Sequence, residues 1–207
     1  MKKLLIATTN PGKLDEIRYF LKDLPLKLLS LADLKIKETP IEDGTTFEEN
    51  AIKKAKFYFK KTKLPVIADD GGLEIDYFNR EPGVKSRRWI GGKGASDKKL
   101  INYTLQKMKG LPLEKRRAQL RTVLALALPN GKIITQEGKI GGIVANKVGA
   151  ITKGYPYRSL FFLPKISKYY DHKTLTKEEY EKYSHRGQAL KKLKKVIKKW
   201  ILCYHCI

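Results

Sequence analysis

The sequence predicts an α/β fold, because helical and extended patterns alternate along the chain. Residues 2–8 form a short apolar run typical of a strand, and residues 14–24 carry apolar side chains at helical spacing. Residues 118–128 and 132–139, joined by Pro129-Asn130-Gly131, carry apolar and β-branched side chains that predict a hairpin. The chain therefore combines helices with a sheet that contains an antiparallel pair.

The remaining elements are expected from capping residues and from the spacing of apolar side chains. A threonine, Thr45 or Thr46, precedes a helix whose first turn holds two glutamates, which is a capping pattern. Ser96 and Thr176 can cap two further helices. We expect strands at 26–31, 64–67 and 73–77, and helices at 45–61, 96–109, 177–183 and 188–200.

Domain organisation follows from length and from the absence of breaks in the pattern. A chain of 207 residues can bury enough apolar surface to fold without metals or disulfides. We see no linker, internal repeat or low-complexity segment, so we expect a single domain over residues 1–207. It ends in a basic amphipathic helix and tail at about 188–207, whose apolar face we expect to dock onto the rest of the domain.

The charge is strongly positive, with 44 Lys and Arg against 21 Asp and Glu and a formal net charge of +23. Such a surface attracts polyanions. Nucleic acid is a possible but not a favoured partner, since no aromatic-rich recognition module accompanies the charge, and lysines along helix faces are also typical of a solvated surface. No apolar run approaches membrane-spanning length, so we expect no membrane partner.

The two cysteines, Cys203 and Cys206, lie close together near the chain end. They cannot form a disulfide framework for the body of the protein, which indicates a reducing, cytoplasmic location. Their spacing also occurs in zinc sites, but without a second ligand pair we do not expect zinc binding within one chain.

Two adjacent carboxylates stand out in the segment Ala68-Asp69-Asp70-Gly71-Gly72-Leu73. Paired carboxylates at the end of a buried strand are typical of a site for a hard cation and an activated water. The same residue types are common in solvated turns, so this segment by itself leaves both interpretations open. In either case we expect Asp69 to Gly72 to form a bend between two extended segments.

The loop Thr9-Asn10-Pro11-Gly12-Lys13 joins the first strand to the first helix. Backbone N–H groups and Lys13 at a helix N-terminus are suited to binding phosphate oxygens. The spacing of a P-loop is absent. A capped helix start, with Asn10 as the cap and Pro11 in the first turn, explains the same residues equally well.

Two further groups of residues have both a structural and a functional interpretation. Glu48 and Glu49 either compensate the helix dipole or bind metal opposite Asp70. Tyr155 or Tyr157 either stacks on a nucleobase or packs locally.

Five motifs occur in order along nearly the whole chain except the tail after Leu193. They are Thr9-Asn10-Pro11-Gly12-Lys13, Thr46-Phe47-Glu48-Glu49-Asn50-Ala51, Ala68-Asp69-Asp70-Gly71-Gly72-Leu73, Pro82-Gly83-Val84-Lys85-Ser86-Arg87-Arg88 and Ser184-His185-Arg186-Gly187-Gln188-Ala189-Leu190. Together they resemble the inosine triphosphate pyrophosphatase family, which removes non-standard purine nucleoside triphosphates such as ITP, dITP and XTP.

This resemblance implies an elongated α/β fold with a mixed central sheet and flanking helices, two lobes around a nucleotide cleft, and usually a homodimer. It implies cleavage of the α–β phosphoanhydride with Mg²⁺ as cofactor, giving a monophosphate and pyrophosphate. Asp70 then corresponds to the proton acceptor and metal ligand, with Asp69 beside it and with Glu42 or Glu49 as a further metal ligand. Residues expected at the triphosphate are Thr9, Asn10, Gly12, Lys13, Lys54 and Arg88, and those at the purine are His185 and Arg186.

The chain departs from the family pattern in the segments expected to touch the substrate. Gly71 replaces a Ser or Thr, and Tyr180 replaces a lysine for which Lys177 or Lys182 could substitute. In the loop that contains Tyr155 and Tyr157, Pro156 replaces a glycine and Arg158 replaces an aspartate, which reverses charge. The hydrolytic residues are kept, while the base pocket is altered. The alternative is therefore a base-shifted or catalytically weakened relative that binds nucleotides or nucleic acid through its basic surface.

Overall fold

The computed structural model describes residues 1–91, 95–171 and 173–202. These residues divide into two compact units. The first unit comprises residues 1–70, 122–138 and 186–202, and the second comprises the described residues of 71–121 and 139–185. The cysteine motif expected to be zinc-free, Cys203 to Cys206, lies outside the described residues.

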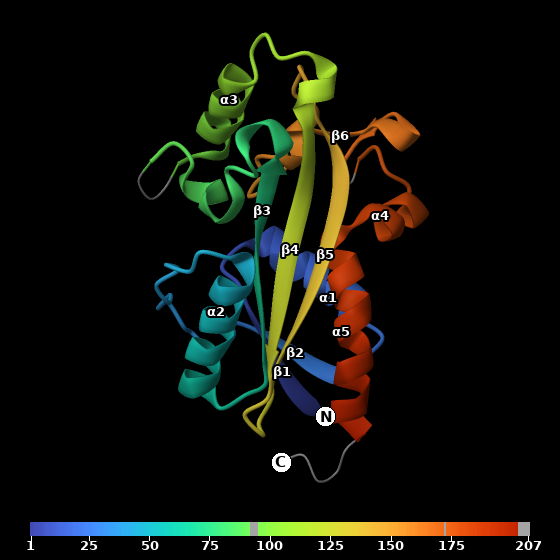
Figure 1. Ribbon diagram of the computed structural model, residues 1–207. Helices are drawn as coiled ribbons and strands as arrows, with labels where there is room; N and C mark the ends of the chain where they lie inside the picture. Colours follow the sequence, from blue (N-terminus) through green and yellow to red (C-terminus); the bar gives the residue numbers. More distant parts are fainter. Residues whose placement is uncertain (92–94, 172, 203–207) are drawn as a thin grey trace. The chain divides into compact units, whose positions relative to one another are not determined.

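Within the described chain, seven strands form a sheet in the order β2-β1-β3-β4-β5-β6-β7 (Figure 1). Three of them, β3, β4 and β5, contribute residues to both units. The strands are β1 (Lys2–Ala7), β2 (Leu26–Ser30), β3 (Val66–Ile75), β4 (Arg117–Ala127), β5 (Ile133–Val144), β6 (Phe161–Leu163) and β7 (Lys168–Tyr169).

Helices connect and flank these strands, as an α/β fold requires. The α-helices are α1 (Pro11–Leu21), α2 (Phe47–Thr62), α3 (Asp97–Lys107), α4 (Lys177–Tyr183) and α5 (His185–Leu202). Short 3₁₀ turns are η1 (Asp76–Phe78), η2 (Gly83–Arg88), η3 (Leu113–Arg116), η4 (Arg158–Leu160) and η5 (Pro164–Ile166).

The sheet is mixed. Strand β1 pairs in parallel with β2 and with β3, and the registers include Leu4 opposite Leu28 and Ile6 opposite Ile67. Strand β6 pairs antiparallel with β5 and with β7. A strand buried on both faces reads as a continuous apolar run, and in β1 the consecutive residues Leu4, Leu5 and Ile6 are all fully buried. The predicted mixed sheet with flanking helices is therefore confirmed.

Local sequence signals predicted several element boundaries correctly. The long β4–β5 hairpin is visible in Figure 1, and its turn is closed by the N–H of Leu128, which donates to the carbonyl of Lys132 at 2.9 Å. The side chains of Thr46, Ser96 and Thr176 each accept a backbone N–H at the start of α2, α3 and α4. These caps satisfy donors that a helix leaves unpaired at its N-terminus.

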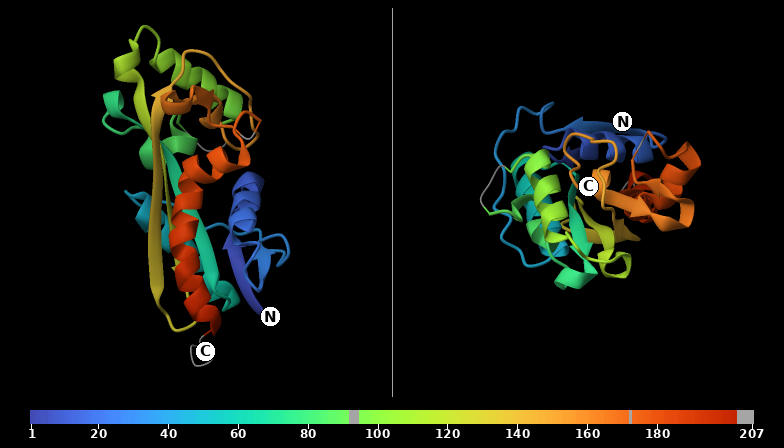
Figure 2. Two further views of the ribbon diagram at one scale, coloured as in Figure 1. Left: turned by 90° about the vertical axis from the view of Figure 1, so that its right-hand side faces the viewer. Right: turned by 90° about the horizontal axis from the view of Figure 1, so that it is seen from above.

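The last helix packs through its apolar face, as predicted. Leu190, Leu193 and Ile197 are fully buried. Near its start, α5 lies against α1 in the first unit (Figures 1 and 2), where Gly187 allows close approach of the Phe20 ring. No helix in the described part of the chain is long and apolar enough to cross a membrane.

The expected bend at Asp69 to Gly72 is wrong. Strand β3 runs without interruption from Val66 to Ile75, and both glycines lie inside it. Gly72 serves close packing instead: a Cβ there would lie 2.0 Å from Oγ of Ser86. That hydroxyl accepts the N–H of Leu73 at 3.0 Å and donates to the carbonyl of Gly83 at 2.7 Å. Packing in the second unit therefore overrides the turn preference of Asp and Gly.

We expect Gly72→Ala to destabilise the fold by about 1–3 kcal/mol, because the added methyl group overlaps the Ser86 side chain. Urea unfolding would measure the loss. Gly141→Ala is the matched control in strand β5, since a Cβ at Gly141 meets no atom within 4 Å, and we expect it to change stability by less than about 0.5 kcal/mol. Equal stabilities of the two variants would contradict the packing role of Gly72.

Candidate active site

Two neighbouring carboxylates at the end of the first unit's part of β3 face different surroundings. Side chains alternate between the two faces of a strand. Asp69 contacts residues of α1, β4 and α5, whereas Asp70 contacts a residue of α2. Both are buried, with 3% and 8% of their surface exposed. Each buried charge therefore needs its own set of partners.

Asp69 is surrounded by donors. Arg186 donates from Nε to Oδ2 of Asp69 at 2.7 Å, and Thr122 donates from its hydroxyl to the same oxygen at 2.8 Å. Lys13 forms an ion pair with Oδ1. Although burial opposes ionisation, the charges of Arg186 and Lys13 outweigh it and hold the pKa of Asp69 well below its usual value. Asp69 is thus a fixed anion.

Asp70 shares one cation with Glu42. The Lys54 ammonium lies 2.9 Å from Oδ1 of Asp70 and 3.1 Å from Oε2 of Glu42. Burial works against the charge on Lys54, but the carboxylates of Asp70 and Glu42 outweigh it and raise the pKa of this lysine. For Asp70 burial dominates, so its pKa is raised even with Lys54 and Lys13 nearby. Adjacent carboxylates with pKa values shifted in opposite directions are typical of a division between acid–base and structural roles.

The first turn of α1 contributes Lys13 to this site through its side chain. Asn10 caps the helix, and its Oδ1 accepts the N–H of Gly12 at 2.9 Å and the N–H of Lys13 at 3.2 Å. The capped-helix interpretation is therefore confirmed, and these two backbone donors are already used. Thr9 is exposed just before the cap.

Glu42 belongs to a loop that is tied to the start of α2. Buried Asn50 accepts the N–H of Gly44 through Oδ1 at 2.8 Å, and a Cβ on Gly44 would lie 2.6 Å from that oxygen. The other candidate, Glu49, is exposed and accepts the N–H and the hydroxyl of Thr45 at 2.7 and 3.0 Å. Of the two glutamates, Glu42 is the one that shares a cation with Asp70.

The donor set around Lys54 suits a hard cation. Carboxylate oxygens of Asp70 and Glu42 converge on the ammonium of Lys54, which occupies the place that a metal cation would take between them. Mg²⁺ binds through one or two carboxylates together with substrate phosphates. Among the described residues, no group of three or more His, Cys, Asp or Glu side chains is arranged to hold a metal by itself. The residues present therefore fit a metal that completes its coordination with substrate and water.

In the second unit, Arg158 lies between aromatic rings. Its guanidinium carbon is 3.8 Å from the ring centroid of Tyr155 and 4.8 Å from that of Tyr170. The ring centroid of Tyr170 lies 6.5 Å from that of Tyr180, in a stacked arrangement, and 5.8 Å from that of His185, in an edge-on arrangement. All five side chains are buried. Four of the residues expected at the base thus gather in one aromatic–arginine cluster with Tyr170.

The other predicted residues of the second unit make different contacts or lie at the surface. Tyr157 donates its hydroxyl to the carbonyl of Ser86 at 2.5 Å, and burial raises the pKa of Tyr157 well above its usual value. Pro156 is buried and its carbonyl accepts the Ser159 hydroxyl at 2.7 Å. Arg88 is exposed at the end of η2, and Gly71 is partly exposed in β3.

Sequence reasoning missed four residues that organise these clusters. Thr122 lies in the middle of an apolar strand, and Tyr170 lies in an irregular segment without a motif. Asn50 is part of a helix-start motif, which does not indicate its contact with Gly44. Glu16 binds the guanidinium of Arg186, but its position three residues after Lys13 on the same helix predicts only a surface ion-pair partner.

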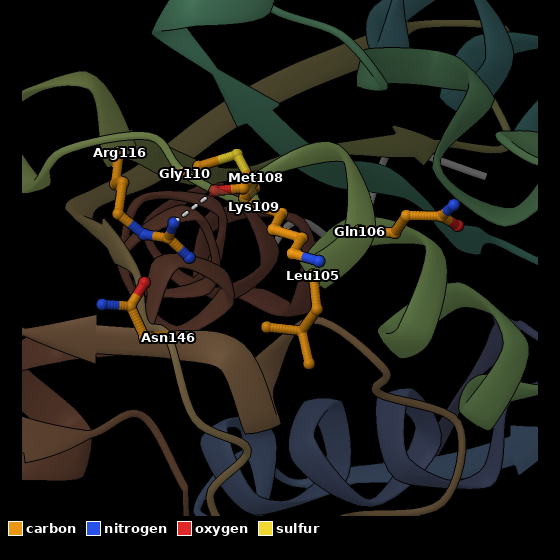
Figure 3. A pocket seen from close by; sticks show the side chains of 7 residues that line it. All are labelled: Leu105, Gln106, Met108, Lys109, Gly110, Arg116 and Asn146. Atoms are coloured by element: carbon orange, nitrogen blue, oxygen red, sulfur yellow. Dashed lines mark hydrogen bonds between the residues drawn. The ribbon is translucent and has the colours of Figure 1, made fainter.

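A separate pocket of about 410 Å³ lies in the second unit (Figure 3). Arg116 forms part of its wall and is almost fully buried. Its guanidinium donates to the carbonyls of Met108 and Val144, each at 2.7 Å, and of Ala145 at 3.0 Å. Arg116 therefore ties two other backbone segments, at Met108 and at Val144–Ala145, to its own around this pocket.

Comparisons with known proteins agree with this architecture. The family model described as the Ham1 family matches residues 4–196. A dITP/XTP pyrophosphatase of Thermus thermophilus is 41% identical over 191 residues, which cover 92% of this chain and 89% of the relative. The dITP/XTP pyrophosphatase of Bacillus subtilis is 39% identical over 197 residues, covering 95% and 98%.

A solved structure also matches. The HAM1 protein of Coxiella burnetii superposes with a TM-score of 0.81 at 33% identity, covering 96% of this chain and all of that one. The resemblance that the five sequence motifs indicated is confirmed, and the chain belongs to the Ham1 family.

Proposed function

We propose that this chain is a nucleoside triphosphate pyrophosphatase that acts on non-standard purine nucleotides such as dITP, XTP and ITP. The observation that carries the proposal is the pair Asp69 and Asp70, in which one carboxylate is fixed as an anion and its neighbour has a raised proton affinity. The names of the relatives, dITP/XTP pyrophosphatase, support the choice of substrate.

In the proposed reaction, a water molecule attacks the α-phosphorus and gives up a proton to Asp70. A bond forms between the water oxygen and phosphorus, and the α–β anhydride bond breaks. Pyrophosphate leaves with the bonding electrons, and the nucleoside monophosphate remains. The raised pKa of Asp70 suits it for this proton transfer, since a base works best when its pKa approaches the working pH.

Lysine side chains of the first unit would bind the triphosphate. Lys13 is partly exposed, with 20% of its side chain accessible, and is anchored on Asp69. Lys54 is more buried and is held by Asp70 and Glu42. The ammonium of Lys54, fixed in advance, would stabilise the charge that develops on the departing pyrophosphate without reorganising at the moment of reaction, whereas Lys13 would bind the phosphates equally in the ground state and the transition state. Thr9, which is exposed just before α1, would contribute as well, whereas the N–H of Gly12 is already bound by Asn10.

We assign a Mg²⁺ site to Asp70 and Glu42, because these two carboxylates already share a cation. When bound, Mg²⁺ neutralises phosphate charge and lowers the pKa of a bound water. Glu49 is the less suited candidate, since its carboxylate caps the start of α2.

For the base we propose the aromatic–arginine cluster of the second unit. Tyr155, Tyr180 and His185 offer ring faces and edges, and Arg158 carries only hydrogen-bond donors where family members have an aspartate. Donors suit a purine that presents carbonyl oxygens, such as the 6-oxo group of hypoxanthine or xanthine. Arg186 was expected at the base, but its guanidinium is engaged with Asp69 and Glu16, so we assign it to holding Asp69.

A panel of triphosphates tests the proposal. Purified protein with Mg²⁺ should release pyrophosphate from ITP, dITP or XTP at least about tenfold faster, in kcat/KM, than from ATP or GTP, a selectivity that needs only about 1.4 kcal/mol. No pyrophosphate from any nucleotide would refute the activity. Comparable rates on all of them would refute the substrate class while leaving the reaction intact.

The variant Asp70→Asn tests the role of the base. Because an amide cannot accept the proton from water, we expect a loss of about 10²–10⁴-fold in kcat. Circular dichroism would check that the variant folds. Asp76→Asn is the matched control, since Asp76 is an exposed carboxylate paired with Arg80 at 3.4 Å, and we expect it to retain full activity. Activity retained in Asp70→Asn would remove Asp70 from the mechanism.

We also propose the homodimer that the family resemblance implies. Exposed apolar side chains in the second unit, Tyr77 of η1 and Leu113 of η3, support such a contact. Light scattering would give the mass in solution, which can be compared with the 23.7 kDa of one chain. Nucleic-acid binding through the lysine-rich surface stays a prediction from the charge.

A further inference from the structure

Glu16 is a buried carboxylate that the proposed chemistry does not use. It lies on α1, and only 2% of its side chain is exposed. A charged group almost never occupies such a position unless it is paired. Its partner is Nη1 of Arg186, which donates to Oε2 of Glu16 at 2.5 Å.

Arg186 divides its donors between two carboxylates. Nη1 binds Glu16, while Nε binds Oδ2 of Asp69 at 2.7 Å. A third contact, from Nη2 to Oδ1 of Asp69, is long at 3.4 Å. Because Glu16 binds the Nη1 end of this guanidinium, Oδ1 of Asp69 forms its main ion pair with another cation.

That cation is Lys13, which forms its ion pair with Oδ1 of Asp69. The four groups make an alternating row in the first unit: Glu16, Arg186, Asp69 and Lys13. Two negative and two positive charges balance within it. Lys13, at the end of the row, is the most exposed member, since 20% of its side chain is accessible while those of the other three are at most 3% exposed.

We propose that Glu16 is a positioning residue that, through Arg186 and Asp69, holds the ammonium of Lys13 in place for a phosphate group. Without the charge of Glu16, Arg186 turns its Nε–Nη2 edge fully onto Asp69, because a bidentate guanidinium–carboxylate pair is the preferred geometry. Oδ1 of Asp69 is then shared, and Lys13 loses its fixed anchor. This inference rests on the proposed function only in assigning Lys13 to phosphate.

The test compares Glu16→Gln with Asp15→Asn. Gln keeps the size of the side chain and an acceptor for Arg186 but removes the charge. Asp15 is the neighbouring, exposed carboxylate on the same helix and has no place in the row. Affinity for inorganic tripolyphosphate, measured by calorimetry at fixed Mg²⁺, reports phosphate binding whether or not a nucleotide is turned over.

We expect Glu16→Gln to weaken tripolyphosphate binding about tenfold and to raise KM similarly, with kcat changed less than about threefold, since Lys13 binds ground state and transition state alike. Asp15→Asn should match the wild type. In a Lys13→Met background, Glu16→Gln should cause no further loss, because its effect passes through Lys13. A merely structural role would lower stability without this dependence on Lys13.

Three outcomes would overturn the inference: wild-type affinity in Glu16→Gln, an equal loss in the Lys13→Met background, or no tripolyphosphate binding by the wild type. If Glu16→Gln does not fold, Glu16→Asp replaces it. That variant keeps the charge but retracts it from Arg186, and unchanged affinity there would also refute the role. If the wild type binds tripolyphosphate with this dependence but hydrolyses no nucleotide, the proposed function fails and the inference stands.

Discussion

Burying the carboxylate of Asp69 requires positive charge on several sides, and the first unit brings that charge from distant parts of the chain. Lys13 comes from α1, Arg186 from α5, and the Thr122 hydroxyl from β4. Breaking such a buried pair by removing one partner leaves an uncompensated charge and costs about 3–5 kcal/mol. The position of α5 against α1 is therefore linked to the ionisation of Asp69, and the close contact between Gly187 and Phe20 allows it.

The next residue of the same strand, Asp70, has surroundings that shift its pKa in the opposite direction. Asp70 faces α2, where it shares the single ammonium of Lys54 with Glu42, and burial raises its pKa. In the proposed mechanism, one peptide step thus separates a carboxylate that organises cations from one that exchanges a proton. Because strand geometry alternates the two side chains between faces, each environment can be set without disturbing the other.

The sequence predicted features that depend on neighbouring residues. Caps at Asn10, Thr46 and Thr176 and the β4–β5 hairpin have local signals, and they are found where expected. The extended backbone at Gly72 could not be predicted, because it depends on packing against Ser86, which belongs to a later segment of the chain. The role of Arg186 was beyond local signals for the same reason: its partner Glu16 is 170 residues away.

The neighbouring carboxylates of Asp69 and Asp70 differ in proton affinity, because their pKa values are shifted in opposite directions. Carbon-13 NMR of the side-chain carboxyl groups, followed against pH in the metal-free protein, measures this directly, with Asp69→Asn and Asp70→Asn used to assign the signals. Opposite pKa shifts predict that Asp70 takes up a proton at a pH where Asp69 remains ionised. Protonation of Asp69 before Asp70, or of both together, would contradict the account.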